Sequence, residues 1–130
     1  NMTEKEWGGA MSTFEKDYGH DGLVMDSVFK FPTIGISMTE AVDLLNIPNP
    51  DHIKMDVDGI EHLILKGGST VLKKAKSVLI EINDKFEEQA SHASRYLKEA
   101  GFVLKEKRHA EYFDNSPTVA RYTYNQIWIK

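Results

Sequence analysis

The sequence predicts an α/β fold in which helices cover a sheet, and three observations support this expectation. Segments with the apolar pattern of strands alternate along the chain with segments whose apolar residues follow helical spacing. Residues 77–83 form a continuous apolar run, which is typical of strands buried on both faces of a parallel sheet. Helical connections require parallel pairing of the strands that they join, whereas the link before the last strand is short enough for an antiparallel partner. We therefore expect parallel strands with an antiparallel end.

Composition limits the classes of protein that remain. The chain has 130 residues, which suits one globular domain. It has 16 Lys and Arg against 20 Asp and Glu, and the resulting net charge of -4 argues against nucleic acid as the main partner. The absence of Cys excludes disulfides, thiolate metal sites and a Cys nucleophile. No apolar run approaches the roughly 18 residues of a membrane span, so we expect a soluble, cytoplasmic domain with no membrane partner.

The chain begins with a segment that is hard to assign. Residues 1–30 combine turn signals with weak periodicity, so we expect a poorly defined N-terminal segment before a domain that covers residues 31–130. A short strand is predicted for residues 33–37. Ser37 and Glu40 have the spacing of a capping box, in which each side chain accepts a hydrogen bond from the other residue's backbone amide. The helix that follows has an apolar face made of Met38, Val42 and Leu45.

The middle of the chain is predicted to contain two strands with two short helices between them. Apolar and polar residues alternate over residues 52–57, which predicts a strand that Gly59 ends. Ser69 is placed to cap the second short helix, and residues 77–83 form the next strand. The first short helix has an apolar face made of Ile60, Leu63 and Ile64.

The last part of the chain is predicted to contain a longer helix and two strands. Helical spacing over residues 86–100, with Gly101 at the expected C-terminal cap, predicts the helix. Residues 102–107 form the next strand, and a polar connection covers residues 109–118. The closing strand, over residues 121–130, has an aromatic face that we expect in the core or at an interface. That face consists of Tyr122, Tyr124 and Trp128.

Four polar residues are expected at the carboxyl ends of two neighbouring strands. Asp56 and Asp58 come at the end of the first strand, and Glu81 and Asn83 at the end of the next. Ligands of open parallel sheets bind outside this edge. Carboxylates there can bind a cation, orient a hydroxyl group or act as a general base, above all if crowding raises one of their pKa values. Asp56 is the strongest candidate, because a carboxylate within an apolar strand needs a functional reason.

Structural explanations compete for some residues of this segment. Asp58 before Gly59 can cap the following helix. Lys54 and Glu61 are expected as surface charges. His62 is expected on a solvated helix face and is a lesser catalytic candidate.

Familiar metal and nucleophile motifs are absent from the sequence. An EF-hand loop with Gly59 at its invariant glycine would place Lys54 and Leu65 where carboxylates are required. The five His residues show no HxxxH or comparable zinc-ligand spacing. No P-loop and no G-x-S-x-G elbow is present. We therefore predict no metal site, although a divalent cation on Asp56 and Glu81 is left open.

Three segments together resemble the signature of FkbM-type S-adenosylmethionine-dependent methyltransferases. They are IKMDVDGIE at residues 53–61, LKGG at residues 65–68 and VLIEI at residues 78–82, where the family typically has K-I-D-V-E-G-x-E, L-K-G-A and a strand ending in Glu. Asp58 stands in place of the commoner Glu, and Gly68 in place of Ala. The resemblance covers roughly residues 33–130 and is strongest over residues 50–83.

The resemblance implies the C-terminal part of a Rossmann-like class I methyltransferase sheet. Residues 54–57 would be its fourth strand and residues 78–83 its fifth, with the last two strands at its antiparallel end. The implied reaction is methyl transfer from S-adenosylmethionine to a hydroxyl group of a small-molecule acceptor, such as a sugar or a secondary metabolite. Because the protein must position the reactants and accept a proton, Asp56 is the expected base or orienting carboxylate. The supporting residues would be Asp58, Glu81, Asn83 and, less centrally, His62.

The cofactor-binding half of such a fold has no counterpart in the sequence. No segment reads as a strand, a G-x-G-x-x-G loop and a helix in succession, so the cofactor-binding residues are left unassigned. We therefore expect a fragment of a longer enzyme that binds S-adenosylmethionine weakly or not at all by itself. The alternative is a non-catalytic binding or assembly module, in which the strand at residues 53–57 is an exposed edge that pairs with a second copy of the chain.

Overall fold

The computed structural model describes most of the chain from residue 30 onward and a few residues before it. The residues described are 14, 16–19, 21–24, 26, 30–109, 114 and 119–130. Most of the N-terminal segment and most of the polar connection predicted at residues 109–118 therefore lie outside the described residues. No described helix is both long enough and apolar enough to cross a membrane.

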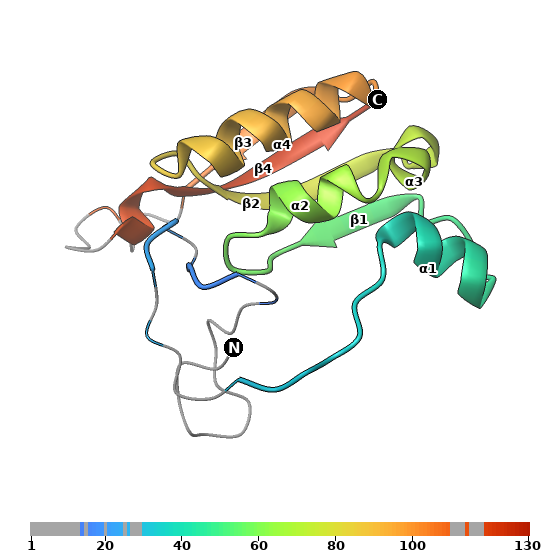
Figure 1. Ribbon diagram of the computed structural model, residues 1–130. Helices are drawn as coiled ribbons and strands as arrows, with labels where there is room; N and C mark the ends of the chain where they lie inside the picture. The colour runs from blue at the N-terminus through green and yellow to red at the C-terminus, as the bar shows by residue number, and fades with distance from the viewer. Residues whose placement is uncertain are drawn as a thin grey trace.

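The centre of the domain is a mixed sheet with four described strands (Figure 1). Along the sheet the order is β1-β2-β4-β3, in which β1 and β2 are parallel and β4 is antiparallel to both of its neighbours. This arrangement confirms the prediction of parallel strands with an antiparallel end. The strands are β1 (His52–Met55), β2 (Ser77–Asn83), β3 (Val103–Arg108) and β4 (Thr123–Ile129).

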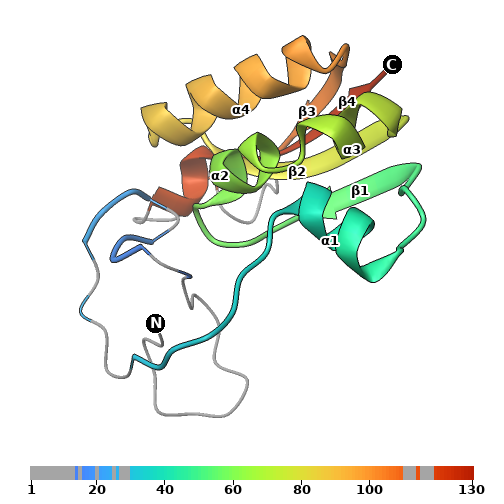
Figure 2. The same cartoon turned by 45° about the vertical axis from the view of Figure 1, so that its right-hand side comes forward.

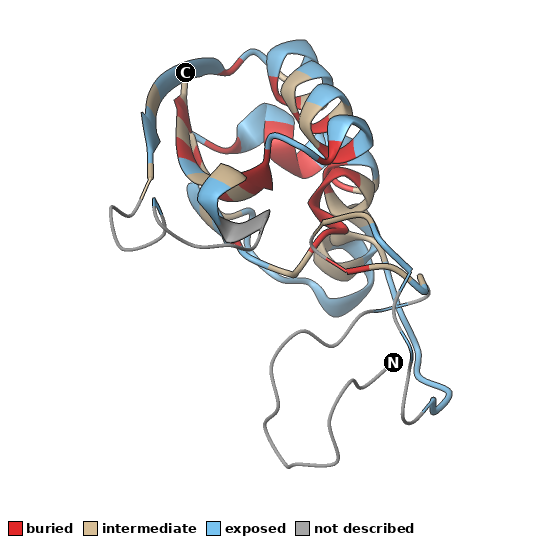
Figure 3. Ribbon diagram, turned by 90° about the vertical axis from the view of Figure 1, so that its left-hand side faces the viewer, coloured by how far each residue is buried: buried red, intermediate tan, exposed pale blue. Residues whose placement is uncertain are grey.

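Helices connect the strands and lie along one side of the sheet (Figure 2). The two short helices α2 and α3 join β1 to β2, and the longer α4 joins β2 to β3. The core lies between these helices and the sheet, where the ribbon segments coloured as buried face one another (Figure 3). Ile80 of β2, Leu97 of α4 and Trp128 of β4 are almost fully buried there. The helices are α1 (Met38–Leu45), α2 (Glu61–Lys66), α3 (Ser69–Lys74) and α4 (Glu87–Glu99), with a 3-10 turn, η2, at Val119–Tyr122.

The start of the domain confirms one prediction and corrects another. Ser37 and Glu40 form the predicted capping box: the Ser37 hydroxyl accepts from the Glu40 amide at 3.1 Å, and the Glu40 carboxylate accepts from the Ser37 amide at 2.8 Å. Asn46, in the left-handed conformation, ends the helix before the prolines are reached. The strand predicted at residues 33–37 was wrong. No described strand pairs with this segment, and Ile34 is 93% exposed.

The buried side of α2 differs from the predicted one. Of the predicted apolar face, Ile60 is buried but Leu63 and Ile64 are only half-buried. The other buried residues of the helix are Glu61, His62 and Leu65. The reason is that α4 packs against α2, so the side of α2 that faces α4 is enclosed as well. Ser69 is also corrected: it is the first residue of α3, and Gly68 occupies the cap position without a side-chain hydrogen bond.

The side of the sheet that faces away from the core has no described helix on it, and we call it the open face. Because side chains alternate along a strand, Lys54 of β1 and Glu81 of β2 lie on this face, while Met55 and Ile80 point into the core. On β4, Trp128 of the predicted aromatic face packs in the core, and Tyr122 lies in the preceding 3-10 turn.

Candidate functional site

The loop after β1 has an unusual backbone. Asp58 and Gly59 have φ angles of 57° and 113°, two consecutive values in the left-handed range. Gly tolerates such values because it has no Cβ, and Asp tolerates them better than most residues. The chain can therefore turn sharply from the carboxyl end of β1 into α2, and Asp58 serves this turn rather than capping the helix, whose cap residue is Ile60.

A buried carboxylate holds this loop in place. Glu61 is 2% exposed, and its carboxylate accepts hydrogen bonds at 3.1 Å from the amides of Val57 and Gly59. It also accepts from the side-chain amide of Gln89 on α4, whose oxygen in turn accepts from the Asn83 amide at 2.8 Å. We call these five residues the edge network. It ties the end of β1, the end of β2 and the first turn of α4 into one unit.

The edge network corrects the prediction that Glu61 is a surface charge. Burial raises the pKa of Glu61 above its ordinary value of 4.5, and the hydrogen bonds from the loop amides and Gln89 oppose this shift. Glu61 therefore acts from within the fold by fixing the loop that carries Asp56 and Asp58.

Asp56 lies in water at the end of β1. The strand ends at Met55, and the Asp56 side chain is 47% exposed, so the argument that this carboxylate lies within an apolar strand was wrong. Asp56 Oδ2 accepts a hydrogen bond from Lys54 Nζ at 2.8 Å. The pKa of Lys54 is raised, first by this hydrogen bond and the charge of Asp56 and then, more weakly, by the charge of Glu81. Lys54, Asp56 and Glu81 therefore form a charged group on the open face.

Asn83 is buried and belongs to the turn after β2. Its side-chain oxygen accepts from the Lys85 amide at 3.0 Å, while its backbone amide donates to Gln89. Both contacts stabilise the connection from β2 to α4. Asn83 thus lies at the predicted edge, but its observed bonds are those of a residue that fixes the backbone.

His62 is on the helix side of the sheet, away from Asp56. It is 1% exposed, so the prediction of a solvated position was wrong. Burial lowers the pKa of His62 below its ordinary 6.5; the charge of Glu88 opposes this shift, and His92 and Lys16 add to it. The structure therefore brings Asp56 and Glu81 together on the open face and places His62 elsewhere.

Two residues of the edge network were not singled out by sequence reasoning. Glu61 had a local signal, because an acid two residues after Gly59 can reach back to the amides of a tight turn. Gln89 had none, because its partners lie on two other elements and become neighbours only when α4 packs against α2.

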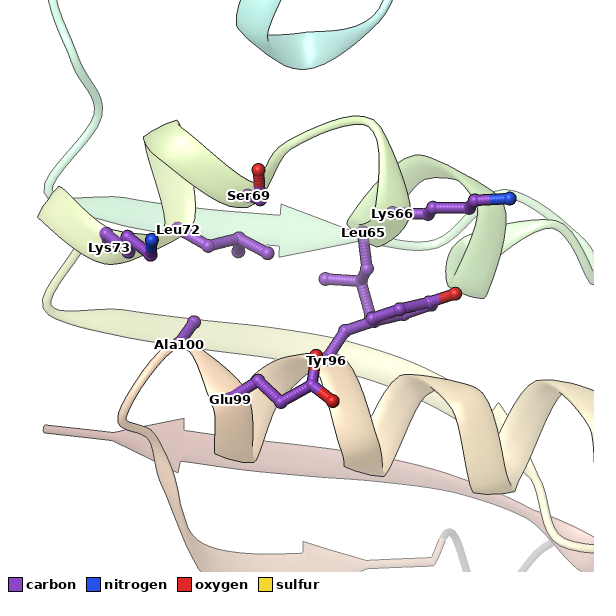
Figure 4. Close-up of a pocket in the computed structure, with 8 residues that line it drawn as sticks. All are labelled: Leu65, Lys66, Ser69, Leu72, Lys73, Tyr96, Glu99 and Ala100. Carbon is purple, nitrogen blue, oxygen red and sulfur yellow. The ribbon is translucent and has the colours of Figure 1, made fainter.

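Two cavities lined by described residues lie apart from the predicted site residues. One, of about 270 Å³, lies between α2, α3 and the end of α4 (Figure 4). The other, of about 290 Å³, lies beside α1 and α2 and includes Phe14 and Ile36. None of the five predicted catalytic residues lines either cavity. The residues around the first are Leu65, Lys66, Ser69, Leu72, Lys73, Tyr96, Glu99 and Ala100.

Comparison with known proteins adds one finding to this geometry. A family model described as "Methyltransferase FkbM domain" matches residues 12–104, more than two thirds of the chain. The matched region includes β1, β2, the edge network and the charged group on the open face. No curated protein and no solved structure matched the sequence significantly.

Proposed function

The chain belongs to the FkbM methyltransferase domain family, and from this premise we propose that it transfers a methyl group from S-adenosylmethionine to a hydroxyl group of a small acceptor. The family indicates methyltransferase activity and implies a cofactor of the S-adenosylmethionine type. The acceptor class, a sugar or a secondary metabolite, is part of the proposal. The strand order β1-β2-β4-β3 supports the further proposal that this is the C-terminal part of a Rossmann-like sheet.

The observation that carries the proposal is the position of Asp56. Its exposed carboxylate lies at the carboxyl end of β1, next to the parallel strand β2. Ligands of open α/β sheets bind outside this edge. An acceptor hydroxyl group can reach Asp56 there without any rearrangement of the core.

The chemistry asked of Asp56 is acceptance of a proton. A hydroxyl group is a far weaker acid than a carboxylic acid, so the proton moves only as the new oxygen–carbon bond forms. Until then Asp56 accepts a hydrogen bond from the hydroxyl and orients its lone pair. The pKa of Lys54 is raised by Asp56 and, more weakly, by Glu81, and its ammonium group holds the Asp56 carboxylate in place through their hydrogen bond. The edge network fixes the loop to which Asp56 belongs.

The residues described by the structure do not fit a complete site for S-adenosylmethionine. Among them, no strand leads through a Gly-rich loop into a helix, the arrangement that places backbone amides against a nucleotide-type cofactor. Neither cavity contains the acids at the edge of the sheet. We therefore assign residues only to the acceptor side. Weak cofactor binding by this chain alone stays a prediction.

Dimerisation through β1 is less well supported. β1 is an edge strand of the described sheet, as that alternative expects. It has only four residues, however, and the exposed Lys54–Asp56 ion pair lies at its end. Short edges with charged side chains resist pairing with another strand.

Asp56→Asn, made in the natural protein at its full length, tests the proposal. We expect methyl transfer from labelled S-adenosylmethionine to a panel of hydroxylated acceptors to fall by about 10²–10⁴-fold, because the amide cannot accept the proton. Stability should change little, because the side chain is largely in water. Unfolding in urea would check this.

Asp51→Asn is the matched control. Asp51 is also exposed and paired with a lysine, at 3.1 Å from Lys76, but it lies before β1, at the opposite end of the strand. Its activity should match the unmodified protein. Equal activities for Asp56→Asn and Asp51→Asn would remove Asp56 from the mechanism.

A further inference from the structure

The imidazole of His62 is buried without satisfied hydrogen-bonding groups among the described residues. The residue is 1% exposed, and neither of its ring nitrogens has a hydrogen-bond partner among the residues that the structure describes. An imidazole that loses its water without gaining a partner costs free energy, and buried polar side chains in folded proteins are nearly always paired. The ring packs edge-on against Phe86 at 5.9 Å between centroids, but this contact satisfies neither nitrogen.

Two potential ligands on α4 face the same ring. Glu88 Oε1 lies 3.9 Å from His62 Nε2, and the His92 ring lies 6.0 Å from the His62 ring between centroids. Glu88 and His92 are four residues apart, so they occupy one side of α4. A ligand atom from each of the three residues can be chosen so that all lie within 4.8 Å of one another.

This set of donors suits a first-row transition metal ion. Imidazole nitrogen and carboxylate oxygen are ordinary zinc ligands, with bonds of about 2.0–2.2 Å, which put neighbouring ligands of a tetrahedral site about 3.3 Å apart. The observed atoms are somewhat more widely spaced. Glu88, whose side chain is 59% exposed, and the half-buried His92 can rotate inward, while His62 is held by the core.

The charges of the three side chains suit a divalent cation. The neutral imidazole is the form of His that binds metals. The negative charge of the nearby Glu88 carboxylate has no opposite charge on a neutral imidazole, but a bound cation would balance it. Three protein ligands also leave a fourth position for water or another small ligand, as in open zinc sites.

We propose that His62, Glu88 and His92 bind a divalent transition metal ion, of the zinc type, between α2 and α4. The site lies on the helix side of the sheet and is independent of the proposed role of Asp56. The sequence analysis did not predict this site because it searched for pairs of His residues at zinc-ligand spacing. Here α4 supplies Glu88 and His92 from successive turns, and α2 supplies His62.

Titration of the metal-free chain with ZnCl₂ by calorimetry tests the site. We expect one ion per chain and a zinc-dependent rise in the melting temperature, because an ion that binds only the folded state stabilises it. Co²⁺ should give the intense visible bands of a four-coordinate site. Absence of saturable zinc binding, or binding without stabilisation, would overturn the proposal.

Variants on α4 locate the ion without disturbing the core. Glu88→Gln and His92→Gln should each weaken zinc binding by about ten-fold or more, because loss even of a group that only hydrogen-bonds to a ligand has an effect of this size. Each should also reduce the zinc-dependent rise in melting temperature. The controls are Glu87→Gln, next to Glu88 and exposed, and His52→Gln, on β1. If all four variants bind zinc as the unmodified chain does, the ion lies elsewhere and the proposal is wrong.

Discussion

Asp56 and Glu61 lie at the same edge of the sheet, within one short segment, yet one carboxylate is in water and the other is enclosed. Asp56 meets a single lysine on the open face, whereas Glu61 receives two backbone amides and the Gln89 amide beneath the loop. The exposed acid is available to an acceptor and contributes little to the fold. The buried carboxylate of Glu61 is inaccessible to a substrate, and its hydrogen bonds fix the backbone of the loop after β1. Within one acidic motif, Asp56 is therefore the candidate for catalysis, and Glu61 stabilises the loop that carries it.

Removal of Glu61 should give the largest change in stability. Glu61→Ala leaves two loop amides and the Gln89 side chain without their acceptor, so we expect a loss of about 3 kcal/mol in the free energy of unfolding. Asp56→Ala should leave the same quantity nearly unchanged. Urea denaturation of both variants measures the contrast. Similar losses for the two would show that the division into exposed and buried acid is incorrect.

The backbone at Asp58 offers a smaller test of the same loop. Asp58→Ala places a Cβ without a polar group at φ 57° and should destabilise by about 1 kcal/mol, whereas Asp58→Gly should stay close to the original stability. Comparison of the methyl-transfer rates of the two variants separates the role of the Asp58 backbone conformation from that of its carboxylate. If both variants keep full activity, the Asp58 carboxylate takes no part in the reaction.

The pH dependence of stability should give the smallest effect, because a change of pH alters only the protonation of Glu61. The pKa of Glu61 is raised above 4.5, so between 4.5 and the pKa of the folded state the folded protein binds more protons than the unfolded one. The proton-linked part of the stability that Glu61 contributes is therefore full below pH 4.5 and is lost as pH rises through its folded pKa, while its hydrogen bonds to the loop remain. Unfolding curves with a chelator present should show this decline. The decline should be absent from Glu61→Gln, and an identical slope in that variant would contradict the raised pKa.

The fold was largely predictable because its signals are local. The continuous apolar run marked β2 at its observed limits, and the Ser37–Glu40 spacing marked the start of α1. The strand expected at residues 33–37 failed because a strand needs a neighbour, and its β-forming residues find none in the described sheet. Pattern alone does not supply that partner.

The candidate site was less predictable because it depends on contacts between elements. Sequence placed Asp56 and Glu81 at one edge, where the structure also has them. It could not show that α4 would enclose the acidic side of α2 and thereby bury Glu61 and His62. Burial of a charged residue is decided by its neighbours in space, and those neighbours lie about 25–30 residues further along the chain.

The insertion of β4 between β2 and β3 has a consequence for how the chain acquires its structure. Among the described strands β4 comes last in the sequence, and it forms the pairs that join β2 to β3. Until it is synthesised, β2 has only β1 as a partner among the described strands and β3 has none, so the nascent chain exposes unpaired strand edges that attract other chains. Formation of the β2–β4 pairs also closes a long loop, which slows folding. The period between synthesis of β3 and arrival of β4 is therefore the interval in which this domain most needs protection from aggregation.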